Sequence, residues 1–193
     1  MSTGVKLIGL SGVARSGKDT FFKYAQSYLK DKYDIVAARY AFADALKDDI
    51  NEFLIDKTGI TAYTNRLSEK EIIRPMLVAY GRMMRTMTNG TYWINNAQKD
   101  LDKNKYFDRV TFITDVRYEN EYEMIDERDG ICIHLKRVDP EGDFVKYAND
   151  EEAENDPRVE SRADVSVTWE TFGDSPEPYL KVIKPIIDKY FVL

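Results

Sequence analysis

The sequence predicts an α/β fold in which a central parallel sheet is flanked by helices on both faces. Short, strongly apolar runs suit buried strands, and segments with helical apolar spacing alternate with them. The chain has 193 residues, of which 43% are hydrophobic, so it suits one domain with one core over residues 1–193. The expected strands are residues 5–10, 35–42, 110–114, 131–135 and 165–169.

Helices are expected between these strands and after the last one. They should follow Gly17 and cover about 45–54, 75–87, 92–101, 119–128 and 179–190. Ser68 to Glu71 have the spacing of a capping box, but Pro75 should break that helix and a new helix should start near Arg74. Pro185 should kink or shorten the last helix.

Composition excludes several classes of function. A formal net charge of −6 and a pI near 5.0 argue against a nucleic-acid-binding surface, which needs a basic face. The single cysteine, Cys132, lies in an apolar run and cannot form an internal disulfide, and His134 in the same run is expected to be a packed residue rather than a base. No apolar run is long enough to span a bilayer and no signal-peptide pattern is present, so we expect a soluble, cytoplasmic protein.

A phosphate-binding loop is the strongest functional signal. Residues 12–18 fit G-x-x-x-x-G-K, in which backbone N–H groups wrap a nucleotide phosphate and the lysine reaches its oxygens. The loop lies between an expected strand and an expected helix, as a P-loop NTPase fold requires. The residues expected to bind ATP are Gly12, Ala14, Arg15, Ser16, Gly17, Lys18, Asp19 and Thr20. The alternative is a chance glycine-rich turn with an exposed lysine.

Two carboxylates are candidates for holding Mg²⁺ through its water shell. Asp19 stands where a serine or threonine hydroxyl usually follows the lysine, and Asp115 ends the strand at 110–114. Asp115 could instead orient the acceptor, or it could cap the helix that begins near Tyr118. The expected cofactors are therefore ATP and Mg²⁺.

Cations that could bind an acceptor phosphate lie at strand ends and on neighbouring helices. Lys47 and Arg117 follow expected strands, while Arg74 and Arg82 lie on the expected middle helix. For each isolated arginine, a solvated surface charge is the alternative. Residues 139–163 are acidic and lack an apolar period, which predicts a mobile loop or lid, and Arg137 borders it. Together with Arg15 and Arg117, Arg137 would neutralise charge in the transition state.

Three segments resemble the deoxynucleoside monophosphate kinases of bacteriophages. Residues 11–20 resemble that family's R-S-G-K-D-T loop, in which aspartate follows the lysine. Residues 42–47 resemble its F-A-D-P-L-K segment, with Ala45 in place of proline, and residues 114–121 resemble its D-x-R segment. The segments occur in the same order along almost the whole chain.

The resemblance implies a nucleoside monophosphate kinase-like fold, MgATP as donor, and a deoxynucleoside monophosphate as acceptor. It implies that Lys47, Arg74 and Arg117 bind the acceptor, that Asp44 lies near it, and that the acceptor-binding helical region covers about 43–105. It also implies a location in the host cytoplasm if a phage encodes the chain, and makes a homodimer a candidate. The same features resemble phosphomevalonate kinase, so another phosphorylated metabolite is an alternative acceptor. A non-catalytic ATP-binding module is a further alternative.

Overall fold

The computed structural model describes residues 5–103, 109–170, 172–173 and 175–191. The chain forms two compact units. One contains residues 1–40 and 106–193, and the other contains residues 41–105. The second unit spans nearly the same residues as the predicted acceptor-binding region, 43–105, whose role stays a prediction.

The first unit is built on a five-stranded sheet. Every neighbouring pair of strands is parallel, and their order is β2-β3-β1-β4-β5. The strands are β1 (Leu7–Ser11), β2 (Ala37–Tyr40), β3 (Val110–Val116), β4 (Ile131–Val138) and β5 (Val165–Glu170). Each overlaps a predicted strand, so the expected parallel α/β sheet is confirmed.

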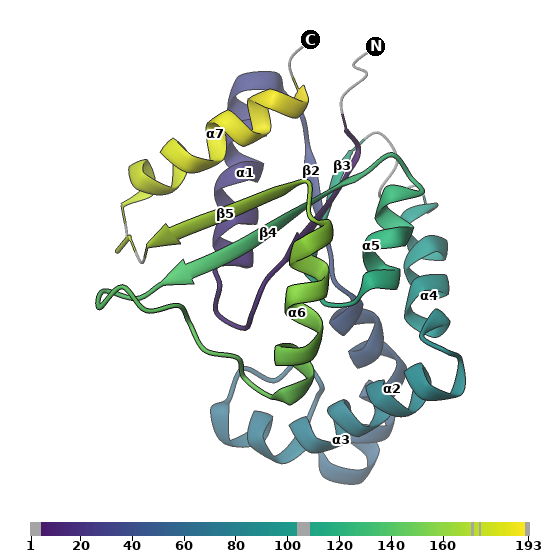
Figure 1. The fold of residues 1–193 in the computed structure, drawn as a ribbon. Coiled ribbons are helices and arrows are strands. Elements are labelled where there is room, and N and C mark those ends of the chain that lie inside the picture. The colour runs from purple at the N-terminus through teal and green to yellow at the C-terminus, as the bar shows by residue number, and fades with distance from the viewer. Residues whose placement is uncertain (1–4, 104–108, 171, 174, 192–193) are drawn as a thin grey trace. The chain divides into compact units, whose positions relative to one another are not determined.

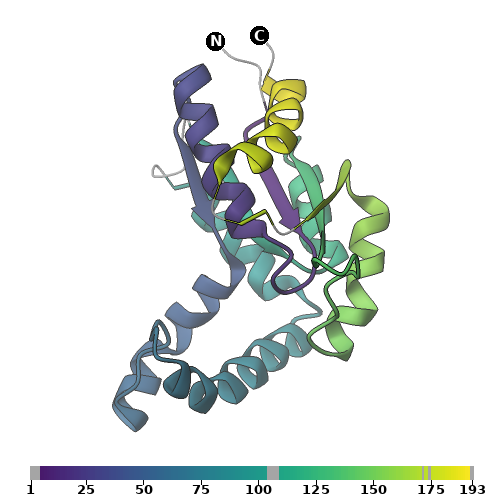
Figure 2. The same cartoon turned by 90° about the vertical axis from the view of Figure 1, so that its left-hand side faces the viewer.

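Helices cover both faces of this sheet (Figure 1). They are α1 (Lys18–Tyr33), α5 (Glu119–Asp126), α6 (Asp150–Arg162) and α7 (Pro176–Phe191). The chain passes from β1 to β2 through α1, but runs in the opposite direction across the sheet through α5 and α6. Because such crossovers are right-handed, α1 lies on the face opposite α5 and α6. Figure 2 shows α7 beside α1.

A large cluster of buried apolar side chains in the first unit lies between the sheet and the α1–α7 pair. Phe21 of α1 and Ile183 of α7 are fully buried with the central strands. Burying a side chain of this size stabilises the fold by about 1.5–3 kcal/mol. His134 and Cys132 are also buried, as predicted, and burial raises the pKa of the Cys132 thiol.

Three helices form the second unit: α2 (Phe42–Thr58), α3 (Leu67–Met87) and α4 (Thr91–Leu101). The small core contains Ile50 and Leu54 of α2 and Ile73 of α3. Trp93 of α4 is buried between the rings of Tyr80 and Tyr92. Among the residues described in either unit, no helix is both long and apolar enough to cross a membrane.

One prediction about proline was wrong, since the helix expected to break at Pro75 is the continuous α3. Helix α7 runs through Pro185 without being shortened, and a kink there stays a prediction. Proline removes one intrahelical hydrogen bond, which for Pro75 would have been accepted by the carbonyl of Glu71. Glu71 is exposed, so water can bond to that carbonyl, and the buried Ile73 keeps the surrounding turns packed.

The predicted lid segment contains a packed helix. Helix α6 occupies residues 150–162 and packs on β1, β4 and α5, with Val159 buried. Residues 139–149 before it are largely irregular, with one bridge between Val138 and Phe144. The apolar period is weak because few α6 positions face the sheet. Movement of this segment as a lid stays a prediction.

Candidate phosphate-binding site

The loop between β1 and α1 has the backbone conformation of an anion cradle. Gly12, Arg15 and Gly17 have φ angles of 123°, 67° and 98°. Left-handed residues in a loop that leads into the N-terminus of a helix are typical of anion-binding sites, because loop amides and the first helical N–H groups can then bond to the anion. Arg15 adopts this conformation without being glycine, a strain that is typical of ligand-binding loops.

Trp169 of β5 contacts the loop at Ser16 and Gly17. Its Nε1 donates a hydrogen bond of 2.8 Å to the carbonyl oxygen of Ser16, which is fully buried. The indole also lies against Gly17, where an added Cβ would be 2.5 Å from Cζ2 of Trp169. Sequence reasoning placed Trp169 in a strand but did not connect it with the loop. Its location at the C-terminal end of a parallel strand was the one available signal.

We expect Trp169→Phe to loosen the loop without emptying the core beneath it. The variant keeps an aromatic ring but loses the bond to Ser16, so the free energy of unfolding should fall by about 1–2 kcal/mol. The dissociation constant for ATP should rise several-fold, as measured by titration calorimetry. Trp93→Phe in the second unit, which removes a 3.4 Å bond to Gly81, is the matched control and should leave ATP affinity unchanged. Equal ATP affinity in the two variants would contradict this role.

Lys18 is folded back onto the loop that precedes it. Its Nζ donates to the carbonyl oxygens of Gly12 at 2.6 Å and Val13 at 2.8 Å. Burial, followed by repulsion from Arg117, lowers the pKa of Lys18 to about 8, although nearby carboxylates oppose the shift. The structure thus brings Lys18, Arg117 and Asp115 into one electrostatic environment, and Lys18 can lose its proton near neutral pH.

The low pKa of Lys18 predicts a pH dependence of nucleotide binding. Above about pH 8 the free protein increasingly holds a neutral Lys18. Binding of a polyphosphate favours the charged form, so the dissociation constant for ATP should rise toward tenfold per pH unit. The stability contribution has the opposite sign: between about 8 and the ordinary value of 10.5, the unfolded chain holds more protons, so raising the pH stabilises the fold. Titrations from about pH 7 to 9.5 would test this, with a flat profile expected in Lys18→Ala.

Arg117 is positioned by the first turn of α5. The buried Glu121 accepts hydrogen bonds from the backbone N–H groups of Arg117 at 2.7 Å and Tyr118 at 3.2 Å. Tyr118 is the N-cap of α5, while Asp115 lies within β3. The alternative assignment of Asp115 as the helix cap is therefore wrong. Glu121 was missed because its partners are backbone groups, which leave no residue pattern.

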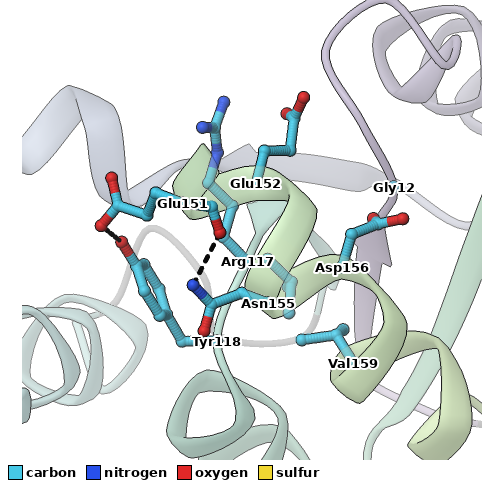
Figure 3. Close-up of a pocket in the computed structure, with 9 residues that line it drawn as sticks. Gly12, Arg117, Tyr118, Glu151, Glu152, Asn155, Asp156 and Val159 are labelled. Atoms are coloured by element: carbon cyan, nitrogen blue, oxygen red, sulfur yellow. Dashed lines mark hydrogen bonds between the residues drawn. The ribbon is translucent and has the colours of Figure 1, made fainter. Parts of the chain in front are cut away.

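Helix α6 closes one side of the loop. A cavity of about 20 Å³ beside Gly12 is lined by Arg117, Tyr118 and the first turns of α6 (Figure 3). Glu152 of α6 is buried, and its Oε1 accepts a hydrogen bond of 2.8 Å from the backbone N–H of Ala14. Sequence analysis gave this glutamate no role.

Three further predicted site residues lie near the loop, in β4 and in the first turn of α1. Nη1 of Arg137 donates to the carbonyl oxygen of Arg15 at 3.2 Å, so this predicted charge-neutralising residue contacts the loop. The side chain of Asp19 is 87% exposed and lies 3.9 Å from Nε of Arg39. Thr20 is partly buried in the first turn of α1. Their roles toward ATP and Mg²⁺ stay predictions.

The other predicted acceptor residues lie in the second unit. Nζ of Lys47 is 3.2 Å from Oδ1 of Asp44 and lies over the ring of Tyr63. The Tyr63 hydroxyl donates to the carbonyl oxygen of Asp44 at 3.1 Å, so it braces this pair. Arg74 and Arg82 line one groove along α3. Binding of an acceptor by these residues stays a prediction.

The strand order and the loop together define an α/β protein with a P-loop. No protein-family model and no curated protein matches the chain. Among solved structures, the dephospho-CoA kinase from Campylobacter jejuni is similar, with 10% sequence identity, a TM-score of 0.48, and coverage of 95% of this chain and 96% of its own. Similarity at this level carries no argument about activity, which has to rest on the site.

Proposed function

We propose that this protein is an ATP-dependent kinase that transfers the γ-phosphoryl group to the phosphate of a deoxynucleoside monophosphate. The observation that carries the proposal is the P-loop, whose left-handed residues lead into the N-terminus of α1 and whose Lys18 shares an electrostatic environment with Arg117. The resemblance of three segments to the phage kinases supplies the acceptor class.

Two glycines of the loop pack so closely on neighbouring residues that no side chain fits at either position. At Gly12 and Gly17, an added Cβ would meet atoms at 2.2 Å and 2.5 Å, so only glycine lets the loop curl this tightly. Amides of residues 14–18 and Nζ of Lys18 would bind the phosphates. No cluster of three or more metal-binding side chains occurs among the described residues. Mg²⁺ bound with ATP would offset phosphate charge, and Asp19 and Asp115 would hold it through water.

Phosphoryl transfer in this site needs positioning and charge neutralisation rather than a strong base. The acceptor phosphate is already ionised, so its oxygen can attack the γ-phosphorus in line as the bond to ADP breaks. The negative charge of the phosphoryl group during its transfer would be offset by Lys18, Arg15, Arg117 and Arg137. We place Asp44, Lys47, Arg74, Arg82 and Arg117 against the acceptor.

The test is an ADP-release assay with MgATP and a panel of deoxyribo- and ribonucleoside monophosphates. Turnover with one or more deoxynucleotides is expected. Phosphomevalonate serves as a competing acceptor, since its selective use would replace the deoxynucleotide with another phosphorylated metabolite. Absence of turnover with every acceptor would contradict the enzyme. A non-catalytic ATP-binding module would show thermal stabilisation by ATP and none from an added monophosphate.

A further inference from the structure

The carboxylate of Glu152 joins three segments that are distant in sequence. Its Oε1 accepts from the Ala14 N–H at 2.8 Å, and its Oε2 accepts from the Ala148 N–H at 2.8 Å. Its own N–H donates to Oδ1 of Asn149, the N-cap of α6, at 2.9 Å. The side chain is 9% exposed. A buried carboxylate whose two oxygens both accept hydrogen bonds from backbone amides is a specific structural contact and not an incidental surface one.

The contact to Ala14 uses an amide of the phosphate cradle. A carboxylate oxygen and a phosphate oxygen are both anionic acceptors that bond to backbone N–H groups in the same way. Bonding to Glu152 Oε1 and to an incoming phosphate therefore compete for one donor. The charge of Glu152 also interacts favourably with Lys18, the other phosphate-binding group of the loop. The Glu152 carboxylate therefore interacts with two groups proposed to bind phosphate, the Ala14 N–H and the Lys18 ammonium.

Negative charge is already crowded on this side of the loop. Asp156 lies one turn after Glu152 on α6, and both line the small cavity beside Gly12 (Figure 3). Burial and the charges of Glu152 and Glu160 raise the pKa of Asp156 to about 6. A triphosphate that entered while Glu152 stayed in place would add several negative charges to this group. The Glu152 carboxylate and a nucleotide phosphate are therefore not expected to bind the Ala14 N–H at the same time.

We propose that Glu152 is a gating residue whose carboxylate occupies the Ala14 amide until a nucleotide phosphate replaces it. Nucleotide binding then releases the first turn of α6 and Ala148 from the P-loop. This inference rests on the proposed phosphate site, and it adds a coupling between that site and α6. Glu152 is a positioning residue in this account, since the reaction itself does not involve its carboxylate.

Metal-free tripolyphosphate is the probe for the competition, because it fills the cradle without a base or a metal. We expect Glu152→Gln to bind tripolyphosphate about tenfold more tightly than the unaltered protein, as measured by calorimetry. The amide oxygen of glutamine can still accept from Ala14, but its NH₂ group cannot accept from Ala148, so the variant loses one of the two hydrogen bonds and should keep its fold. Glu154→Gln is the matched control, since it removes one charge from an exposed α6 position paired with Arg158 and should bind as the unaltered protein does.

Hydrogen exchange of the unaltered protein tests the release without any variant. With saturating tripolyphosphate, the Ala148 amide should exchange faster, although ligands usually slow exchange. Unchanged or slower exchange at Ala148, or equal tripolyphosphate affinity in Glu152→Gln and the unaltered protein, would overturn the gating role alone. Failure of both proteins to bind tripolyphosphate would overturn the phosphate site and the gating role together.

Discussion

Replacing Lys18 with alanine is expected to lower kcat/KM by about 10³-fold or more while leaving the protein folded. The Nζ group lies against the loop, where it donates to the carbonyl oxygens of Gly12 and Val13. Alanine removes the charge that would follow the γ-phosphoryl group during transfer. Steady-state kinetics with the best acceptor from the panel would measure the loss.

The fold should tolerate this change because Lys18 is held in an unfavourable environment. Its pKa is lowered to about 8 by burial, which means that folding disfavours the charged side chain at neutral pH. The melting temperature of Lys18→Ala should therefore be equal to or higher than that of the unaltered protein. Lys23→Ala, an exposed position one turn further along α1, controls for general charge loss and should keep full activity. Comparable turnover in the two variants would remove Lys18 from the mechanism.

The parts of the site predictable from sequence are those encoded locally. The P-loop motif, the apolar run before it and the helical period after it occupy consecutive residues, so their arrangement as β1, loop and α1 could be inferred directly. The placement of Asp115 and Arg117 near Lys18 could be predicted because they lie at the end of a strongly apolar strand. In each case neighbouring residues in the chain determine the backbone path.

The supports of the loop could not be predicted because they come from distant parts of the chain. Trp169 and Ser16 are 153 residues apart in sequence, and Glu152 and Ala14 are 138 apart. Both contacts end on backbone atoms of the loop, so the loop residues themselves carry no complementary pattern. Locating them required the strand order, which places β4 beside β1 and β5 on the far side of β4.

Proline shows how a local rule can be overridden by packing. The rule that proline breaks a helix predicted two shorter helices around Pro75, yet α3 continues because its turns on either side are held by contacts within the second unit. The cost is one lost hydrogen bond at the carbonyl of Glu71, an exposed residue to which water can bond. Sequence alone does not reveal whether that carbonyl faces solvent.

Gly12→Ala should cause the largest loss of stability among the substitutions considered in the loop. An added Cβ would lie 2.2 Å from the backbone carbonyl oxygen of Leu135 and 2.8 Å from Oγ of Ser16, at a φ of 123°. The carbonyl belongs to β4 and cannot turn away without breaking the central sheet. We expect the free energy of unfolding to fall by about 2–4 kcal/mol, and the melting temperature by about 5–15 °C.

Gly142→Ala separates the two causes of that loss. Gly142 also has a positive φ, of 89°, but an added Cβ there would meet nothing within 4 Å. Its variant should lose only about 1 kcal/mol, the cost of a left-handed backbone for a non-glycine residue. The difference between the variants, measured by denaturant unfolding, is the cost of the contact with β4. Equal losses would mean that backbone strain alone explains the glycine, and that the loop can shift away from β4 while keeping its cradle.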